Sequence, residues 1–171
     1  MRMILWVDDD KYFIAPYIEF LEDAGFRVLR ESDASSGLSV FEENRSEICC
    51  VILDMAMDPG IRFTQFESRA GYNAGMLVAR NVNNIDKRVP IIGLSNFYNL
   101  DNEAWFKTRR FSILEKAAIN KDILLSEVMR AIDPNHKAGI RTFIVHGHDG
   151  EILLQLRISC KIHWDSLSQL S

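Results

Sequence analysis

Short, mostly apolar runs recur along the first 132 residues, and most are followed directly by a stretch in which apolar and polar positions follow a helical spacing. Apolar runs of this length without polar alternation are typical of strands buried on both faces of a parallel sheet. We predict five such strands, at residues 3–7, 26–29, 49–53, 89–94 and 111–114.

The stretches between these runs predict helices. Ile14, Ile18 and Leu21 indicate a first helix, in which Pro16 should perturb the first turns and after which Gly25 is a stop signal. Further helices are expected from a cap at Ser32 or Asp33 to about Asn44, over 75–82, from a cap at Asn99 or Asp101 to Thr108, and over 122–132, with Ile123, Val128 and Ala131 facing inward.

Five strand-then-helix units predict an α/β fold, with a doubly wound parallel sheet, right-handed crossovers and helices on both faces. In such sheets, ligands bind beyond the carboxyl ends of the strands. This rule places Asp8, Asp9 and Asp10 at one rim with Asp54, Ser95 and the residues after position 114, although they lie far apart in the chain.

Residues 55–73 interrupt the alternation. They lack clean periodicity and contain Pro59, Gly60 and Gly71, which predicts a long loop or an irregular insertion. Local packing is favoured over a partner surface for its arginine and aromatic side chains, which are Arg62, Phe63, Phe66, Arg69 and Tyr72.

Composition narrows the class of protein. The 171 residues are 47% apolar and 26% charged, which is ordinary for a soluble globular chain and excludes collagen-like, disordered and disulfide-scaffold proteins. The net charge of -4 argues against nucleic-acid binding through bulk electrostatics. The basic run of Lys107, Arg109 and Arg110 is more typical of a solvated helix end than of a phosphate contact.

The three cysteines include the adjacent pair Cys49 and Cys50, and they form neither a disulfide framework nor a zinc-type CxxC pair. A reducing cytoplasmic location is therefore expected. The first apolar stretch is too short for a signal peptide, and no run reaches the roughly 18 apolar residues that a membrane span needs.

The predicted rim carries a specific chemistry. Several ionised carboxylates at one rim repel each other by about 4 kcal/mol per close pair, so they need a cation or shifted pKa values. Oxygen ligands favour Mg²⁺, which Asp8 and Asp9 are placed to grip. Asp54, alone at the end of the central strand, is the candidate nucleophile for a phosphoryl group, while Ser95 and Lys116 can contact the phosphoryl oxygens.

Four segments, ILWVDDD, VILDM, IIGLSN and ILEKA, occur in the order and at the strand ends found in receiver domains of bacterial two-component response regulators. Residues 1–132 resemble this CheY-like, flavodoxin-like family, which implies the strand order 2-1-3-4-5. The resemblance implies Asp54 as phosphoacceptor, with Ser95 and Lys116 assisting. It also implies an Mg²⁺ site of Asp8, Asp9, Asp54 and the Ala56 carbonyl, a sensor histidine kinase as partner and a possible homodimer.

The chain departs from the family in its long 55–73 segment and at three single positions. Asn96 follows Ser95, Ala117 replaces a proline, and Ile113 replaces an aromatic switch residue. These departures motivate a second hypothesis, a pseudo-receiver that serves only in dimerisation or docking. A third is a haloacid-dehalogenase-like phosphohydrolase with Asp8 as nucleophile and Asp10 as acid/base. Otherwise we expect no enzyme activity beyond autophosphorylation and autodephosphorylation.

The remaining residues read as a linker over 133–140 and an incomplete or truncated second domain over 141–171. A strand is expected at 142–145, and strict alternation over 154–164 predicts another. The run TFIVHGHDG resembles the start of a TIR-like nucleotide-binding domain, and its His146, His148 and Asp149 lack the further ligands that a metal site needs. No helix-turn-helix pattern supports transcriptional output.

Overall fold

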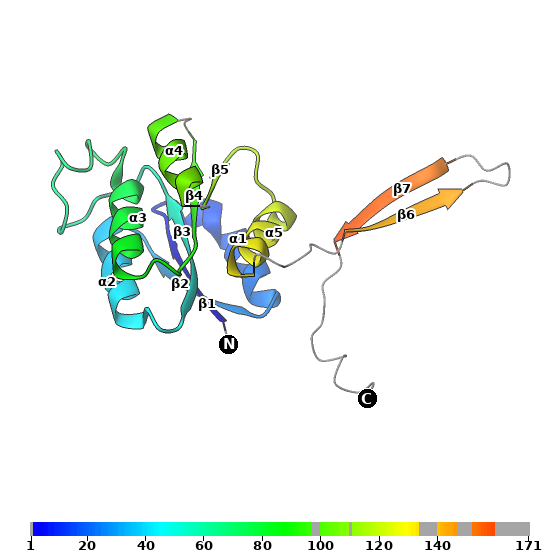
Figure 1. Cartoon of the computed structure of the whole chain (residues 1–171), viewed down its shortest axis with the longest axis horizontal. Helices are drawn as coiled ribbons and strands as arrows, with labels where there is room; N and C mark the ends of the chain where they lie inside the picture. The colour runs from blue at the N-terminus through cyan, green and yellow to red at the C-terminus, as the bar shows by residue number, and fades with distance from the viewer. Residues whose placement is uncertain (1, 97–99, 110, 134–139, 147–151, 160–171) are drawn as a thin grey trace. The chain divides into compact units, whose positions relative to one another are not determined.

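The computed structural model describes residues 2–96, 100–109, 111–133, 140–146 and 152–159. The chain divides into two compact units, Met1–Asn135 and His136–Ser171 (Figure 1). Among the described helices, none is both long enough and apolar enough to cross a bilayer. Some of the sequence predictions concern residues outside the described ranges, namely 110, 134–139 and 160–164 and the single residues Asn99, His148 and Asp149.

The first unit is built on a five-stranded sheet, and every neighbouring pair of its strands is parallel. The strand order is β2-β1-β3-β4-β5, which confirms both the predicted fold class and the order implied by the resemblance. The strands are β1 (Arg2–Val7), β2 (Phe26–Glu31), β3 (Ile48–Asp54), β4 (Ile91–Ser95) and β5 (Ser112–Glu115).

Five helices follow the strands, and side-chain caps explain where three of them begin. Asp10 accepts hydrogen bonds from two backbone N–H groups at the start of the first helix, and Asp33 and Asn120 each cap another. The first helix continues through Pro16, and Asp101 lies inside its helix instead of capping it. The helices are α1 (Lys11–Asp23), α2 (Ala34–Asn44), α3 (Ala74–Ile85), α4 (Leu100–Thr108) and α5 (Lys121–Ile132).

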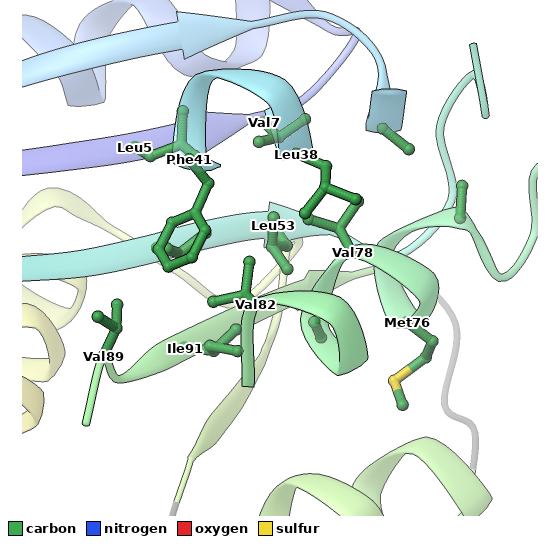
Figure 2. Packing of buried hydrophobic residues seen from close by; sticks show 14 of the residues in the cluster. Leu5, Val7, Leu38, Phe41, Leu53, Met76, Val78, Val82, Val89 and Ile91 are labelled. Carbon is green, nitrogen blue, oxygen red and sulfur yellow. The ribbon is translucent and has the colours of Figure 1, made fainter. Parts of the chain in front are cut away.

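Alternation along the strands divides the core into two layers, because successive side chains point to opposite faces of a sheet. Leu5, Val7 and Leu53 lie on one face and pack with side chains of α2 and α3. Figure 2 shows this layer, in which Leu38 and Phe41 of α2 and Val78 and Val82 of α3 lie against the sheet.

The opposite face contributes the alternate residues of the same strands, among them Ile4, Trp6 and Ile52, and packs against α1 and α5 (Figure 1). Leu124 and Val128 are the buried positions of α5. The prediction that Ile123 faces inward is wrong, since 41% of it is exposed.

The second unit contains two strands, β6 (Ile140–His146) and β7 (Ile152–Ser159), which pair antiparallel. This pairing confirms the strand predicted at 142–145 and, over its described part, the alternating strand predicted from position 154.

Candidate functional site

The carboxyl ends of the adjacent strands β1 and β3 bring acidic residues to one edge of the sheet. Asp8 directly follows β1, and its backbone N–H donates to the Glu31 carbonyl at 3.0 Å. Asp54 is the last residue of β3 and lies in register with Leu94 of β4. Two carboxylates that are 46 positions apart in sequence are therefore fixed by the backbone of adjacent strands.

Lys116, the first residue after β5, reaches both of these carboxylates. Its Nζ lies 2.9 Å from Asp8 Oδ2 and 2.7 Å from Asp54 Oδ2, and none of the three side chains is more than 7% exposed. The exposed Asp9 completes the group, because one carboxylate oxygen from each of Asp8, Asp9 and Asp54 lies within 4.8 Å of the others. We call these four residues the charge cluster.

The charges of the cluster do not balance, since one ammonium faces three carboxylates. Burial raises the pKa of Asp8 and of Asp54, and the neighbouring ammonium of Lys116 only partly opposes this rise. Burial alone would lower the pKa of Lys116, but its contacts with the carboxylates of Asp54 and Asp8 outweigh that effect and raise it. The arrangement favours any further positive charge at this edge.

A hard divalent cation fits this donor set. All available ligand atoms are oxygens, the kind that Mg²⁺ prefers. Asp8 Oδ2 is buried and makes no aligned hydrogen bond among the described residues, so its contact with Lys116 is electrostatic only. An oxygen in this state is available to a metal. Asp54 Oδ1, by contrast, already accepts a hydrogen bond from the Ala56 N–H at 3.1 Å.

Ser95 and Ala56, the other predicted site residues, lie at the same edge. Ser95 ends β4, and its carbonyl accepts a hydrogen bond from the Lys116 N–H at 2.9 Å. This bond ties the start of the β5–α5 loop to the end of β4. Ala56 follows Asp54 by two positions and is half-buried. All predicted site residues therefore lie near the carboxyl ends of β1, β3, β4 and β5.

Two aromatic residues that the sequence analysis did not single out support Lys116. Its Nζ lies 4.9 Å from the centroid of the Phe13 ring, a cation–π distance. The Tyr17 hydroxyl donates to the Ile119 carbonyl at 3.2 Å and so holds the loop that carries the lysine. Both belong to α1, and only their helical spacing indicated that they face the protein.

The 55–73 segment contains turns and no helix or strand, as predicted, and Figure 1 shows it beside the start of α3. We call residues 58–72 the wall segment. Its first part is fastened to α2 by Ser35, whose hydroxyl donates to the Pro59 carbonyl and accepts from the Arg62 N–H, both at 2.7 Å. Arg62 also forms a bidentate ion pair with Glu42, at 2.9 and 3.1 Å.

Close backbone contacts hold the rest of the wall segment. Gly60 has a φ of +66°, and a Cβ there would clash with Asp33 Oδ1. The fully buried Ser68 accepts a hydrogen bond from the Gly71 N–H at 3.2 Å. Arg69 and Ala70 both adopt left-handed conformations, with φ of 50° and 55°, which non-glycine residues rarely do. These contacts and positive φ angles shape the turns of the segment.

The local-packing hypothesis for this segment holds for Phe63, which packs against the core, and for the paired Arg62. It is wrong for Phe66 and Tyr72, whose exposed fractions are 92% and 70%. The spacing of Phe66 and Tyr72 in the sequence does not predict this exposure, because the exposure depends on the conformation of the turns in the wall segment.

An open hollow of about 450 Å³ lies between the charge cluster and the wall segment. Asp9 and Ala56 line it on the side of the cluster. The wall side is lined by Asp58, Gln65, Ala70, Gly71 and Tyr72, together with Met57 and Pro59.

The structure also describes the residues on which the two alternative hypotheses rest. Asn96 and Ala117 are exposed, and Ile113 packs partly buried against the core layer of α2 and α3. The Oδ1 atom of Asp10, the acid/base of the phosphohydrolase hypothesis, accepts hydrogen bonds from the Tyr12 and Phe13 N–H groups as the cap of α1.

Comparison with known proteins gives structural relatives only. No protein-family model matches the chain, and no curated protein sequence matches it significantly. A response regulator receiver domain protein from Clostridium thermocellum is 26% identical with a TM-score of 0.64, over 78% of this chain and 96% of that one. A receiver protein from Sinorhizobium medicae (22%, TM-score 0.62) covers 79% and 97%, and a CheY-like one from Methanospirillum hungatei (20%, 0.61) covers 78% and 95%. The first unit therefore has the fold of response regulator receiver domains.

Proposed function

We propose that the first unit is a signalling receiver in which Asp54 accepts a phosphoryl group from a phosphohistidine of a sensor histidine kinase. The observation that carries this proposal is the charge cluster: a buried carboxylate at the end of the central strand, 2.7 Å from an ammonium and beside two further carboxylates. The receiver fold of the structural neighbours supports the same reading.

Mg²⁺ is the proposed cofactor, and the oxygens of Asp8, Asp9 and Asp54 with the Ala56 carbonyl would hold it. When bound, the ion supplies positive charge to the oxygens of the transferred group. The transfer should require Mg²⁺ because the charge cluster carries excess negative charge, and adding a phosphoryl group beside three carboxylates is unfavourable without a further cation.

The chain's own residues have distinct tasks in the transfer. An Asp54 carboxylate oxygen forms a bond to phosphorus while the P–N bond of the donor breaks, and the electron pair of that bond leaves with the imidazole nitrogen. Lys116 already contacts Asp54 and is placed to pair with one phosphoryl oxygen. The Ser95 hydroxyl would donate to another, and its strand end is tied to Lys116 through the backbone.

Acceptance of the phosphoryl group would act as a switch because it changes the charge at the edge shared by β3, β4 and β5. A shift from 1:99 to 99:1 between two states takes about 5.5 kcal/mol. Charge-assisted hydrogen bonds of roughly 1.5–3 kcal/mol each, from Ser95 and Lys116, could supply much of it.

Incubation with Mg²⁺ and a small phosphodonor, followed by intact-mass measurement, tests the proposal. We expect the mass to increase by one phosphoryl group in the wild type and not in Asp54→Asn. Asp10→Asn is the matched control, since asparagine keeps the cap of α1 and the neighbouring acids are untouched. Wild-type protein that takes up no phosphoryl group would contradict the proposal.

The departures at Ile113, Asn96 and Ala117 favour a second candidate, a docking or dimerisation module that uses the receiver fold without phosphorylation. In that case the mass would stay unchanged, and a homodimer seen by sedimentation would be insensitive to Mg²⁺ and phosphodonor. Repeated turnover of a phosphomonoester, lost in Asp8→Asn and kept in Asp54→Asn, would instead identify the phosphohydrolase.

A further inference from the structure

The hollow beside the charge cluster has a composition suited to one class of leaving group. We propose that it receives the part of the phosphodonor that departs from phosphorus, and that its lining selects a part that is aromatic and positively charged before the transfer over one that leaves as an anion. The inference rests on the proposed function, because it needs phosphoryl transfer to Asp54. On this proposal, the wall segment helps to determine which phosphodonor the protein uses.

The position of the hollow supports this assignment. Asp9 and Ala56, which line it, are also residues that would hold the metal beside the attacking Asp54. A donor whose phosphorus lies at the charge cluster must place the rest of its structure outside the buried edge, because Asp54 is only 5% exposed. The hollow is an opening that adjoins the cluster on the side of the wall segment.

The charges of the lining favour a cation. Asp9 and Asp58 both line the hollow, and no lysine, arginine or histidine does so among the described residues. If Asp9 is engaged with a metal, Asp58 still presents a carboxylate from the wall segment. A protonated imidazole would be attracted to this side, whereas the carboxylate that leaves an acyl phosphate would be repelled.

An aromatic surface completes the lining. Tyr72 is 70% exposed, so most of its surface is uncovered, and it belongs to the residues that face the hollow. Its backbone is held in place, since the Tyr72 N–H donates to the Arg69 carbonyl and the Met57 N–H donates to the Gly71 carbonyl, each at 3.3 Å. An uncovered tyrosine on a held backbone, in the same lining as two carboxylates, is suited to an imidazolium through stacking and cation–π attraction.

The transfer balances for each donor. With phosphoimidazole protonated at its second ring nitrogen, an Asp54 oxygen bonds to phosphorus, the P–N bond breaks, and its electron pair leaves with neutral imidazole. Phosphoramidate loses neutral ammonia from its protonated nitrogen in the same way. Acetyl phosphate breaks a P–O bond instead and releases acetate, which keeps the electron pair and the negative charge.

These three donors separate charge from aromaticity. Second-order rate constants for phosphoryl uptake, measured by mass at low donor concentration with saturating Mg²⁺, include donor binding as well as chemistry. We expect Tyr72→Ala to slow phosphoimidazole by about two- to fivefold, the size of an exposed cation–π contact, to slow phosphoramidate less because it has no ring to stack, and to leave acetyl phosphate unchanged. Asp58→Asn should slow phosphoimidazole and phosphoramidate and leave acetyl phosphate unchanged or faster.

Matched controls keep the test specific. Phe66→Ala removes another exposed aromatic ring of the wall segment, one that does not line the hollow, and it should change none of the rates. Asparagine at position 58 can still accept the Gly60 N–H bond that Asp58 Oδ1 accepts at 2.8 Å, so the backbone turn is retained. Equal unfolding midpoints would show that each variant keeps its fold.

Two different failures can be told apart. Uptake from all three donors, with rates that fall equally in Tyr72→Ala and in Phe66→Ala or do not fall at all, would overturn this inference and leave the proposed function standing. No uptake from any donor by the wild type would overturn the proposed function itself.

Discussion

The charge cluster and the wall segment face the same hollow, but they are held in place by different means. Asp8, Asp54 and Lys116 end strands or follow them directly, and Asp9 comes one residue after Asp8, so parallel pairing of β1, β3, β4 and β5 sets their positions. The wall segment contains no regular structure, and its position depends on the Ser35 hydroxyl, the Arg62–Glu42 ion pair and four residues of positive φ.

This difference suggests a division of labour. A site fixed by a buried sheet is rigid at the atoms where bonds form, which phosphoryl transfer requires. A loop held by a few polar contacts can change in sequence without disturbing the core, so it suits recognition of a particular donor. The two regions should therefore respond separately to substitution.

The largest expected effect comes from removing the ammonium of the charge cluster. Lys116→Met should lower the free energy of unfolding by about 3 kcal/mol, because breaking a buried ion pair leaves carboxylates without a counter-charge. Urea unfolding without Mg²⁺ measures the change. Lys87→Met, which alters an exposed lysine, should stay within about 0.5 kcal/mol of wild type. Equal losses in both variants would show that the buried ammonium has no special role.

The next largest effect is expected in the wall segment, where Ser35→Ala removes the hydroxyl that fastens it to α2. It leaves the Pro59 carbonyl and the Arg62 N–H without their partner, at a cost of about 1–3 kcal/mol. We expect amide hydrogen exchange to accelerate over the wall segment and to stay unchanged in β3. The exposed Ser46 makes no such bridge, and Ser46→Ala should leave exchange as it was. Faster exchange throughout the sheet would mean that the two regions are not separable.

Magnesium binding should depend on the cluster side alone. A ligand present at about ten times its Kd stabilises the folded state by roughly 1.4 kcal/mol, so Mg²⁺ should raise the wild-type melting temperature. Asp9→Asn should abolish this response, and Asp10→Asn, one position further on, should keep it. Loss of the response in both variants, or in neither, would place the ion elsewhere.

The smallest expected effect comes from the contact between the Phe13 ring and the Lys116 ammonium. Replacing the ring of Phe13 by leucine removes a cation–π contact worth about 0.5–1 kcal/mol at exposed sites. In a double-mutant cycle with Lys116→Met, we expect a coupling energy of that size. Phe13→Tyr, which retains a ring, should keep most of the coupling, and additive effects of the two substitutions would exclude the contact.

The fold and the charge cluster could be predicted because they follow from the same pattern. Buried strands such as 49–53 show as apolar runs, and the residue after such a run must lie at the carboxyl edge, so Asp54 was placed by its strand. Element boundaries were less certain: β4 begins at Ile91, after Pro90, which has no N–H to donate to a neighbouring strand.

The wall segment could not be predicted in the same way. Tyr72 and Phe63 both look like packing residues in sequence, yet one is exposed and the other packs against the core. The difference arises from contacts across the chain, such as Ser35 with Pro59, and from left-handed conformations at Arg69 and Ala70 that propensity disfavours. The contact of Phe13 with Lys116 spans 103 positions and left no local signal either.

Mapping the modified residue tests the central claim most directly. Protein treated with phosphoramidate and Mg²⁺ is reduced with borohydride, which converts an aspartyl phosphate to homoserine, and is then digested and sequenced by mass spectrometry. We predict homoserine at position 54, absent when the Mg²⁺ is removed with EDTA. Homoserine at Asp8 or Asp9 instead, or equal conversion of Asp54 without Mg²⁺, would contradict the account.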